Sequence, residues 1–149
     1  MIIRIAEKND APCIARHNLM LAAETEDWQP SYEDALEGSK ELLDHNERGF
    51  YLVAEHDTEI VGQLMVTIEW SDWRNKEIWW LHRIFVKQDW RHQGVFNHLL
   101  EELKKMAEKR NVFVLRLYII NSNQEAISIY LHQGWFKAPF SIFQQYLQD

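Results

Sequence analysis

The residues with the clearest chemical potential lie between 84 and 96, where an apolar run gives way to a basic turn. Ile84-Phe85-Val86 is typical of the end of a buried strand, and Arg91-His92-Gln93 leads into Gly94 at the start of an amphipathic stretch. The first turn of a helix carries unpaired N–H groups and the positive end of the helix dipole, which together attract anions. Basic residues also gather here in an otherwise acidic chain. The segment predicts a phosphate-binding loop, with an ordinary strand-to-helix turn as the alternative.

A second constellation lies at residues 122–134. Ser122, with Glu125 three residues later, predicts a helix start, and Gly134 predicts a left-handed residue at the end of that helix. Tyr130 lies on this helix, and its phenol could serve as an acid. A core aromatic with a hydrogen-bonded hydroxyl is the alternative role.

The candidate general bases are one histidine and three carboxylates. His82 shares a strand face with Ile84, because alternate residues of a strand point the same way. The unperturbed pKa of histidine, about 6.5, suits proton transfer near neutrality. The alternative is a histidine satisfied by a neighbour in the sheet. The rival bases are Glu24, Glu26 and Glu69.

The elements that must position these residues alternate along the chain. Strands are predicted at 2–6, 50–54, 60–69, 77–86, 112–120, 136–140 and 142–147. Helices are predicted from Asp10, from Ser31, from Gly94 to about Lys109, and from Ser122 to Gly134. The three strands between 50 and 86 indicate an antiparallel meander, and the strand–helix–strand unit at 78–119 indicates a parallel pair. The layout is that of an α/β (α+β) fold.

Length and composition limit the remaining choices. The 149 residues predict one domain, 1–149, and a hydrophobic content of 46% with 26% charged residues excludes general disorder. No apolar run approaches the ~20 residues of a membrane span, and the first residues do not predict a secretory signal. A single cysteine, Cys13, excludes an internal disulfide and favours a cytoplasmic location. The net charge of −7 disfavours nucleic-acid binding and suits a cationic partner.

Together, the two constellations resemble the GNAT superfamily of N-acetyltransferases. The signature of that family, Arg/Gln-x-x-Gly-x-Gly/Ala, is matched by Arg91-His92-Gln93-Gly94-Val95-Phe96, with Phe96 in place of the last small residue. An amphipathic helix and a strand follow the signature. The second family motif is then matched by Asn123, Ala126, Tyr130, Gly134 and Trp135. The order of elements agrees over nearly the whole chain.

The resemblance implies a mixed, V-splayed central sheet of six to seven strands flanked by four helices. Acetyl-CoA would enter where strands 78–86 and 112–119 part. The backbone of Ile84, Phe85 and Val86 would pair with the pantetheine arm, and Asn123 would also meet that arm. Arg91 would begin the pyrophosphate loop, in which the N–H groups of His92, Gln93, Gly94, Val95 and Phe96 would hold the diphosphate. Tyr130 would lie near the sulfur.

In related enzymes the end of the first helix and the strand turns border the acceptor pocket. Here both stretches place carboxylates beside tryptophans, in Glu24-Thr25-Glu26-Asp27-Trp28 and in Glu69-Trp70-Ser71-Asp72-Trp73. Ion pairing and contact with aromatic faces both stabilise an ammonium group. The residues expected to bind the acceptor are Glu24, Glu26, Glu69, Asp72 and Trp73. Solvated loop acids, and tryptophans that cover the core edge, are the alternative.

The implied activity is direct acetyl transfer from acetyl-CoA, as cosubstrate, to a primary amine of a small molecule or peptide. His82 would be the base and Tyr130 the acid, with no metal and no covalent enzyme intermediate. A non-catalytic acyl-CoA-binding or sensing domain is the alternative function, motivated by Phe96 and by the open choice of base. A tRNA- or ribosome-linked modifier is a third hypothesis, which the net charge disfavours. The resemblance also leaves a homodimer open.

Overall fold

The computed structural model describes residues 1–148, which form four α-helices, two 3₁₀ helices and five strands. The strands are β1 (Ile2–Ile5), β2 (Gly49–His56), β3 (Glu59–Ser71), β4 (Lys76–Val86) and β5 (Val114–Leu117). The helices are α1 (Ala11–Thr25), α2 (Tyr32–Asp44), α3 (Val95–Lys109) and α4 (Gln124–His132), with 3₁₀ helices η1 (Lys8–Asp10) and η2 (Gln88–Trp90). The chain divides into two units, residues 1–118 and residues 119–149.

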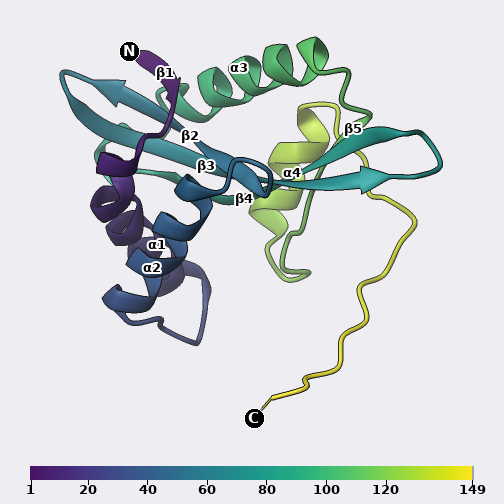
Figure 1. The fold of residues 1–149 in the computed structure, drawn as a ribbon, viewed down its shortest axis with the longest axis horizontal. Coiled ribbons are helices and arrows are strands. Elements are labelled where there is room, and N and C mark those ends of the chain that lie inside the picture. Colours follow the sequence, from purple (N-terminus) through teal and green to yellow (C-terminus); the bar gives the residue numbers. More distant parts are fainter. Residues whose placement is uncertain (149) are drawn as a thin grey trace. The chain divides into compact units, whose positions relative to one another are not determined.

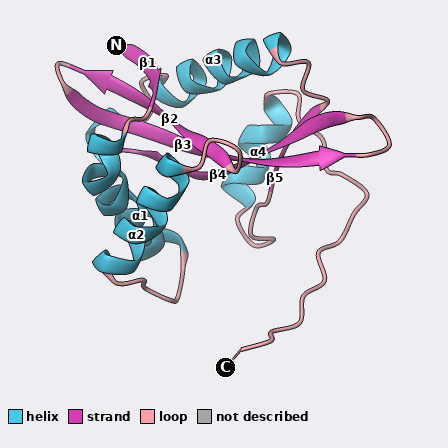
Figure 2. Ribbon diagram, in the orientation of Figure 1, coloured by secondary structure: helices cyan, strands magenta, loops and turns pink. Residues whose placement is uncertain are grey.

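The first unit is built on a mixed sheet with the strand order β1-β2-β3-β4-β5 (Figure 2). The first four strands are antiparallel neighbours, so the predicted meander is confirmed. β5 runs parallel to β4, because α3 carries the chain back across the sheet between them. The predicted parallel pair is also confirmed, although β5 is shorter than the strand expected at 112–120.

Helices cover both faces of this sheet: α1 and α2 lie on one side and α3 on the other (Figure 1). Neighbouring residues of β3 show the two environments, because successive side chains of a strand point to opposite faces. A Cβ added at Gly62 would lie 2.7 Å from a Val95 side-chain carbon of α3, so the helix approaches the strand closely there. The side chain of Gln63 instead bonds to Asn18 of α1.

The helix starts in the first unit follow local sequence signals. Ser31 caps α2, and its hydroxyl accepts a hydrogen bond from the N–H of Asp34 at 3.0 Å. Pro12 lies in the first turn of α1, where a missing N–H has no cost. α3 buries one stripe of side chains against the sheet, including Val95, Leu99 and Leu103. Among residues 1–148, no helix has the length and apolar character that a bilayer crossing requires.

The second unit contains α4 and a C-terminal segment without regular structure. Asn123, rather than Ser122, caps α4, and Gly134 ends it in the predicted left-handed conformation with φ 90°. The strands expected at 136–140 and 142–147 are wrong, because residues 133–148 contain neither helix nor strand. A strand needs a hydrogen-bonding neighbour, and α4 offers none within this unit. The sheet accordingly has five strands, not six or seven.

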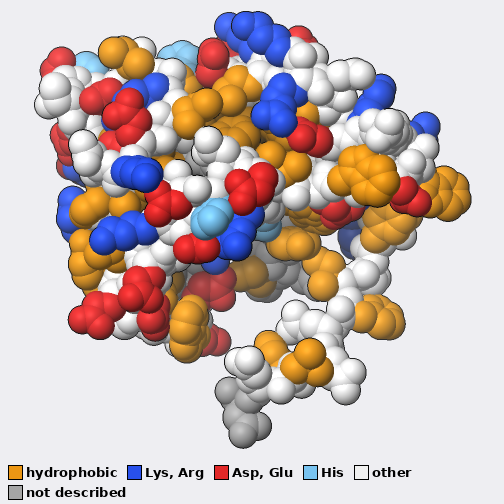
Figure 3. Space-filling view, in the orientation of Figure 1, with side chains coloured by type: hydrophobic (Ala, Val, Ile, Leu, Met, Phe, Trp, Pro, Cys, Tyr) orange, Lys and Arg blue, Asp and Glu red, His pale blue; other side chains and the backbone are white. Residues whose placement is uncertain are grey.

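Acidic side chains concentrate at the α1 and α2 side of the first unit. Figure 3 shows this gathering at the lower left, in the region where Figure 1 places the two helices. α2 contributes five carboxylates against one lysine: Glu33, Asp34, Glu37, Glu41 and Asp44, with Lys40. The negative net charge is therefore concentrated beside one face of the sheet.

Candidate functional site

The parallel strands β4 and β5 pair over only part of β4. Four residues of each strand are paired, and the last pair is Leu81 with Leu117. β4 then continues to Val86 beside β3 alone. Within residues 1–118, no strand covers the other edge of β4 beyond Leu81. The two strands part as the family resemblance implied, and the edge at residues 84–86 is left without a strand partner.

A β-bulge follows this separation. The register between β3 and β4 shifts between Gln63 and Met65, so that Arg83 and Ile84 together lie opposite Leu64. Arg83 has φ 50°, a left-handed conformation that costs a non-glycine residue about 1–2 kcal/mol. Bulges bend a strand and increase its twist. This bulge therefore redirects β4 just after it has left β5.

The turn between β4 and α3 presents backbone N–H groups without protein partners. Gly94 is the N-cap of α3 with φ 84°, no side chain caps this end of the helix, and His92 is also left-handed with φ 62°. Within residues 1–148, the backbone N–H groups of residues 92–95 meet no acceptor. A Cβ added at Gly94 would find no atom within 4 Å, so the adjacent space is open. Free amides at the positive end of a 15-residue helix fit the diphosphate of acetyl-CoA.

The basic side chains of this turn are already paired with carboxylates. Arg91 donates through Nη2 to both Glu24 oxygens, at 2.8 and 3.0 Å, and through Nε to the carbonyl of Val86 at 2.8 Å. Lys87 pairs with Glu59, a hydrogen bond that raises the pKa of Lys87. These two pairs largely cancel the local positive charge expected from the sequence. An anion bound here would therefore interact with the amides and the helix dipole, while Arg91 fastens the turn to β4 and α1.

His82 lies on β4 just before the bulge and is half-buried. Its Nε2 is 2.9 Å from the Thr67 hydroxyl oxygen, and its ring centre is 5.8 Å from that of Tyr118. Burial lowers the pKa of His82, and the positive charge of Arg83 lowers it further. The imidazole is consequently neutral at pH 7, with one ring nitrogen able to accept a proton. When the hydroxyl accepts from Nε2–H, Nδ1 is that nitrogen.

Trp80 extends the face of the sheet that carries the histidine, two residues earlier on β4. Its Nε1 donates to Glu69 Oε1 at 2.9 Å, and its ring centre lies 4.8 Å from that of Tyr118. The Arg116 guanidinium lies 5.8 Å from the Trp80 ring centre. Glu69 is therefore a predicted acceptor residue that shares a face with the candidate base. The sequence analysis did not identify three of these site residues: Thr67, Trp80 and Tyr118. The two-residue alternation of strand side chains would have identified Thr67 on β3 and Trp80 on β4.

The five residues predicted to bind the acceptor are not gathered in one pocket within residues 1–118. Asp72 and Trp73 lie in the turn between β3 and β4, where Trp73 is 92% exposed. Glu24 lies beside Arg91, beyond the opposite end of β4. The 11 residues of β4 separate these two places by roughly 30 Å. Glu26 is an exposed residue just after α1. The prediction was based on carboxylates that neighbour tryptophans in the sequence. That pattern does not show that the long β3–β4 hairpin carries Asp72 and Trp73 far from Glu24.

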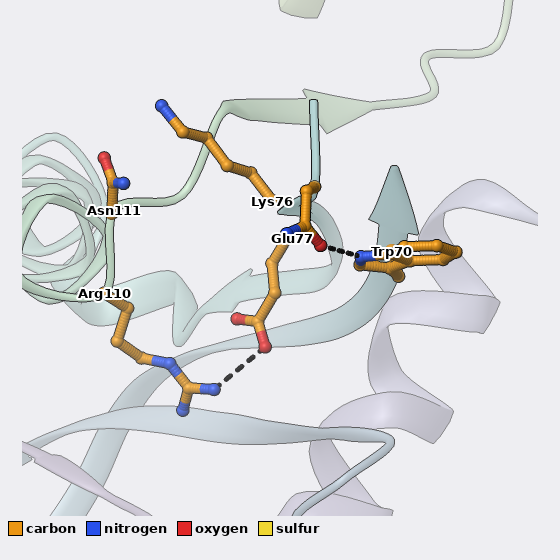
Figure 4. A pocket seen from close by; sticks show the side chains of 6 residues that line it. Trp70, Lys76, Glu77, Arg110 and Asn111 are labelled. Carbon is orange, nitrogen blue, oxygen red and sulfur yellow. Dashed lines mark hydrogen bonds and ion pairs between the residues drawn. The ribbon is translucent and has the colours of Figure 1, made fainter. Parts of the chain in front are cut away.

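A hollow of about 310 Å³ lies at the start of β4, away from the turn that precedes α3 (Figure 4). It is lined by Trp70, Asn75, Lys76, Glu77, Arg110 and Asn111. Glu77 pairs with Arg110 at 2.9 Å, and Trp70 Nε1 donates to Asn75 Oδ1 at 3.1 Å. Four of the six lining side chains therefore bond to one another in pairs, and the hollow lies at the opposite end of β4 from the free amides.

The second unit holds two predicted site residues, Tyr130 and Asn123. The Tyr130 ring meets Trp135 edge-on at 5.4 Å, and burial raises the pKa of Tyr130 to about 12. The side-chain oxygen of Asn123 accepts from the N–H of Ala126 at 3.1 Å, which caps α4. The cap thus engages Oδ1, and Nδ2 is the group of Asn123 suited to a cofactor arm.

Comparisons with known proteins identify the family and the fold. Residues 15–135 match the model of the acetyltransferase (GNAT) family. An uncharacterised N-acetyltransferase of Archaeoglobus fulgidus is 30% identical over 135 residues, which cover 89% of this chain and 91% of the relative. The solved structure of a possible acetyltransferase from Clostridium difficile 630 is 31% identical, with a TM-score of 0.94 over 99% of this chain and 98% of that one. A predicted acetyltransferase from Clostridium acetobutylicum, solved with acetyl-CoA, shares the fold with a TM-score of 0.78 at 14% identity over 97% and 95% of the two chains.

Proposed function

Because this chain belongs to the GNAT acetyltransferase family, we propose that it transfers an acetyl group directly from acetyl-CoA to a primary amine of a small molecule or peptide. One observation carries the proposal: free amides at the start of α3 lie beside the part of β4 that has no partner strand. Acetyl-CoA supplies an activated acyl group when bound. The N–H groups of residues 92–96 would hold its diphosphate, and residues 84–86 would hold its pantetheine arm.

The amine must be neutral to attack, and a lysine-like amine has an unperturbed pKa of ~10.4. His82 is the base we assign to this deprotonation, directly or through one water, because its lowered pKa keeps it neutral near pH 7. Its rivals are less suited. Both oxygens of Glu24 accept from Arg91, and Glu69 Oε1 accepts from Trp80. The Thr67 contact would hold the imidazole in one orientation.

The acceptor we propose is cationic. The carboxylates of α2 and of the end of α1 lie on the side of the sheet that also carries Gln63 and, by alternation, His82. They would attract a positively charged amine toward that face. Glu69 would contribute an ion pair near the base, whereas the Trp80 ring already meets Arg116.

Two measurements on the intact chain test this function. Acetyl-CoA at 100 times its Kd should stabilise the fold by ~2.7 kcal/mol, or roughly 5–10 °C in Tm. Mixing the chain, acetyl-CoA and a panel of diamines, amino acids, aminoglycosides and peptides should release free CoA with at least one amine. Binding without release across the panel would favour the alternative, a non-catalytic acyl-CoA-binding domain, which the bulky Phe96 of the loop motivates. No Tm shift would contradict both.

Tyr130→Phe is expected to lower kcat by about 10- to 100-fold with little change in the Kd for acetyl-CoA. A phenol with a pKa of about 12 keeps its proton and can donate a hydrogen bond to the departing thiolate. Such a charged hydrogen bond contributes about 1.5–3 kcal/mol. Single-turnover rates and equilibrium binding of the variant measure the two effects separately. Unchanged turnover would assign Tyr130 to packing against Trp135 instead.

A further inference from the structure

A network of buried side-chain amides contacts the β-bulge of β4. Its residues lie outside both sequence motifs, at 91–96 and at 123–135. Gln63 of β3 is fully buried, at 0% exposure. Its Nε2 donates to Asn18 Oδ1 of α1 at 2.8 Å and to the carbonyl oxygen of Arg83 at 3.3 Å. Asn18 in turn donates from Nδ2 to the hydroxyl of the buried Tyr51 at 3.0 Å. Two carboxamides, those of Gln63 and Asn18, thus join α1, β2 and the bulged residue of β4.

Burial of a glutamine side chain is energetically unfavourable at this position. The flanking residues of the same strand face, Val61 and Met65, are apolar, and burying an amide is unfavourable unless its polar atoms are bonded. Even here the Gln63 oxygen makes no hydrogen bond of ordinary geometry within residues 1–148, although the His17 side chain lies close enough to interact with Gln63. A leucine or methionine would fill the space without that penalty. The value of the amide therefore lies in what its nitrogen holds.

The Gln63 nitrogen bonds to the carbonyl of Arg83, the residue of β4 whose backbone is strained. Arg83 is left-handed, and in-register pairing with β3 resumes only after the bulge, with Phe85 opposite Gln63 itself. β5 has already ended its pairing at Leu81, so it cannot fix the bulge from the other side. The orientation of residues 84–86 is consequently set by β3, by the Gln63 amide at the bulge and by Arg91 at the Val86 carbonyl.

We propose that Gln63 is a positioning residue that, through the Arg83 carbonyl, sets the β4 backbone at residues 84–86 in the geometry that receives the pantetheine arm. The inference rests on the proposed function, because it assumes that acetyl-CoA binds along this edge. Asn18 belongs to the same device, since it orients the carboxamide from α1.

The test compares Gln63→Met with the unmodified chain by titration calorimetry. Methionine keeps the unbranched shape of glutamine but cannot donate. We expect the Kd for acetyl-CoA to rise about fivefold or more, the equivalent of one hydrogen bond. The Kd for the nucleotide half of CoA, which carries the diphosphate but no pantetheine, should be unchanged. Amide chemical shifts of residues 83–87 should move in the variant before any ligand is added.

Val53→Ala is the matched control. Val53 is buried and is the β2 residue paired with Gln63, so its truncation loosens the same layer without touching the bulge. It should lower Tm and leave both Kd values alone. Should Gln63→Met fail to fold, Asn18→Ala carries the test, because it leaves the glutamine in place but frees its amide.

Each outcome is decisive. Equal Kd values for acetyl-CoA in Gln63→Met and the unmodified chain would overturn this inference and leave the proposed function standing. Equal weakening of acetyl-CoA and of the nucleotide half would overturn it too, because the change would then not be confined to residues 84–86. Failure of the unmodified chain to bind acetyl-CoA would overturn the proposed function and this inference together.

Discussion

Proline in place of Gly94 is expected to abolish acetyl-CoA binding while residues 1–118 stay folded. Gly94 has φ 84°, whereas proline fixes φ at about −65° and has no N–H. The substitution therefore removes one of the free amides and redirects its neighbours in an exposed turn outside the sheet. We expect the Kd to rise by more than about 100-fold, or ~2.7 kcal/mol, in titration calorimetry.

Two alanine variants serve as controls for this loss. Gly94→Ala keeps the N–H and has room for the methyl group, so it bears only the left-handed strain of about 1–2 kcal/mol and should bind with intermediate affinity. Gly38→Ala lies inside α2, also with open space, and should raise stability by up to ~1 kcal/mol with no change in binding. A proline variant that bound acetyl-CoA normally would place the diphosphate elsewhere.

The turn at Gly94 could be predicted because its signals are local. A glycine between a strand end and an amphipathic run indicates a helix start with special backbone geometry, and the left-handed φ of Gly94 agrees. The charge of the turn could not be predicted in the same way. Glu24 lies 67 residues from Arg91, and Glu59 lies 28 residues from Lys87. The sequence around 91 shows the cations but not the carboxylates that the fold brings to them.

Two other features were beyond a reading of local pattern. The apolar residues at 136–147 have strand-forming character, but strand formation depends on a neighbouring edge that pattern does not reveal. No glycine marks the position of the bulge at Arg83 in the sequence. The role of the buried Gln63 amide depends on its contacts with Asn18 and the Arg83 carbonyl, which only the fold brings together. Periodicity finds faces and ends, whereas contacts between distant segments decide which polar groups are satisfied.

His82→Gln is expected to lower kcat/KM for a cationic acceptor by about 100-fold or more, the usual contribution of a general base. Glutamine can keep a hydrogen bond to Thr67 but cannot take up a proton near neutrality. In the unmodified chain, activity should fall on the acid side with a midpoint below 6.5, because burial and Arg83 lower the pKa of His82. That acidic limb should vanish in the variant. An acidic limb that persists unchanged would transfer the role to a carboxylate such as Glu69.

The choice of acceptor separates a base from a merely structural histidine. An ammonium acceptor must lose a proton before it attacks, whereas an amine that is already neutral at the assay pH needs less help. The rate loss in His82→Gln should therefore shrink with weakly basic amines, while a loss from disturbed packing would be equal for all acceptors. Tm must be followed alongside. Because the pKa of His82 is lowered in the folded state, the neutral imidazole contributes to stability above about pH 6.5, and this contribution declines as the pH falls below that value. Loss of activity through unfolding at acid pH must therefore be separated from loss through protonation of the base.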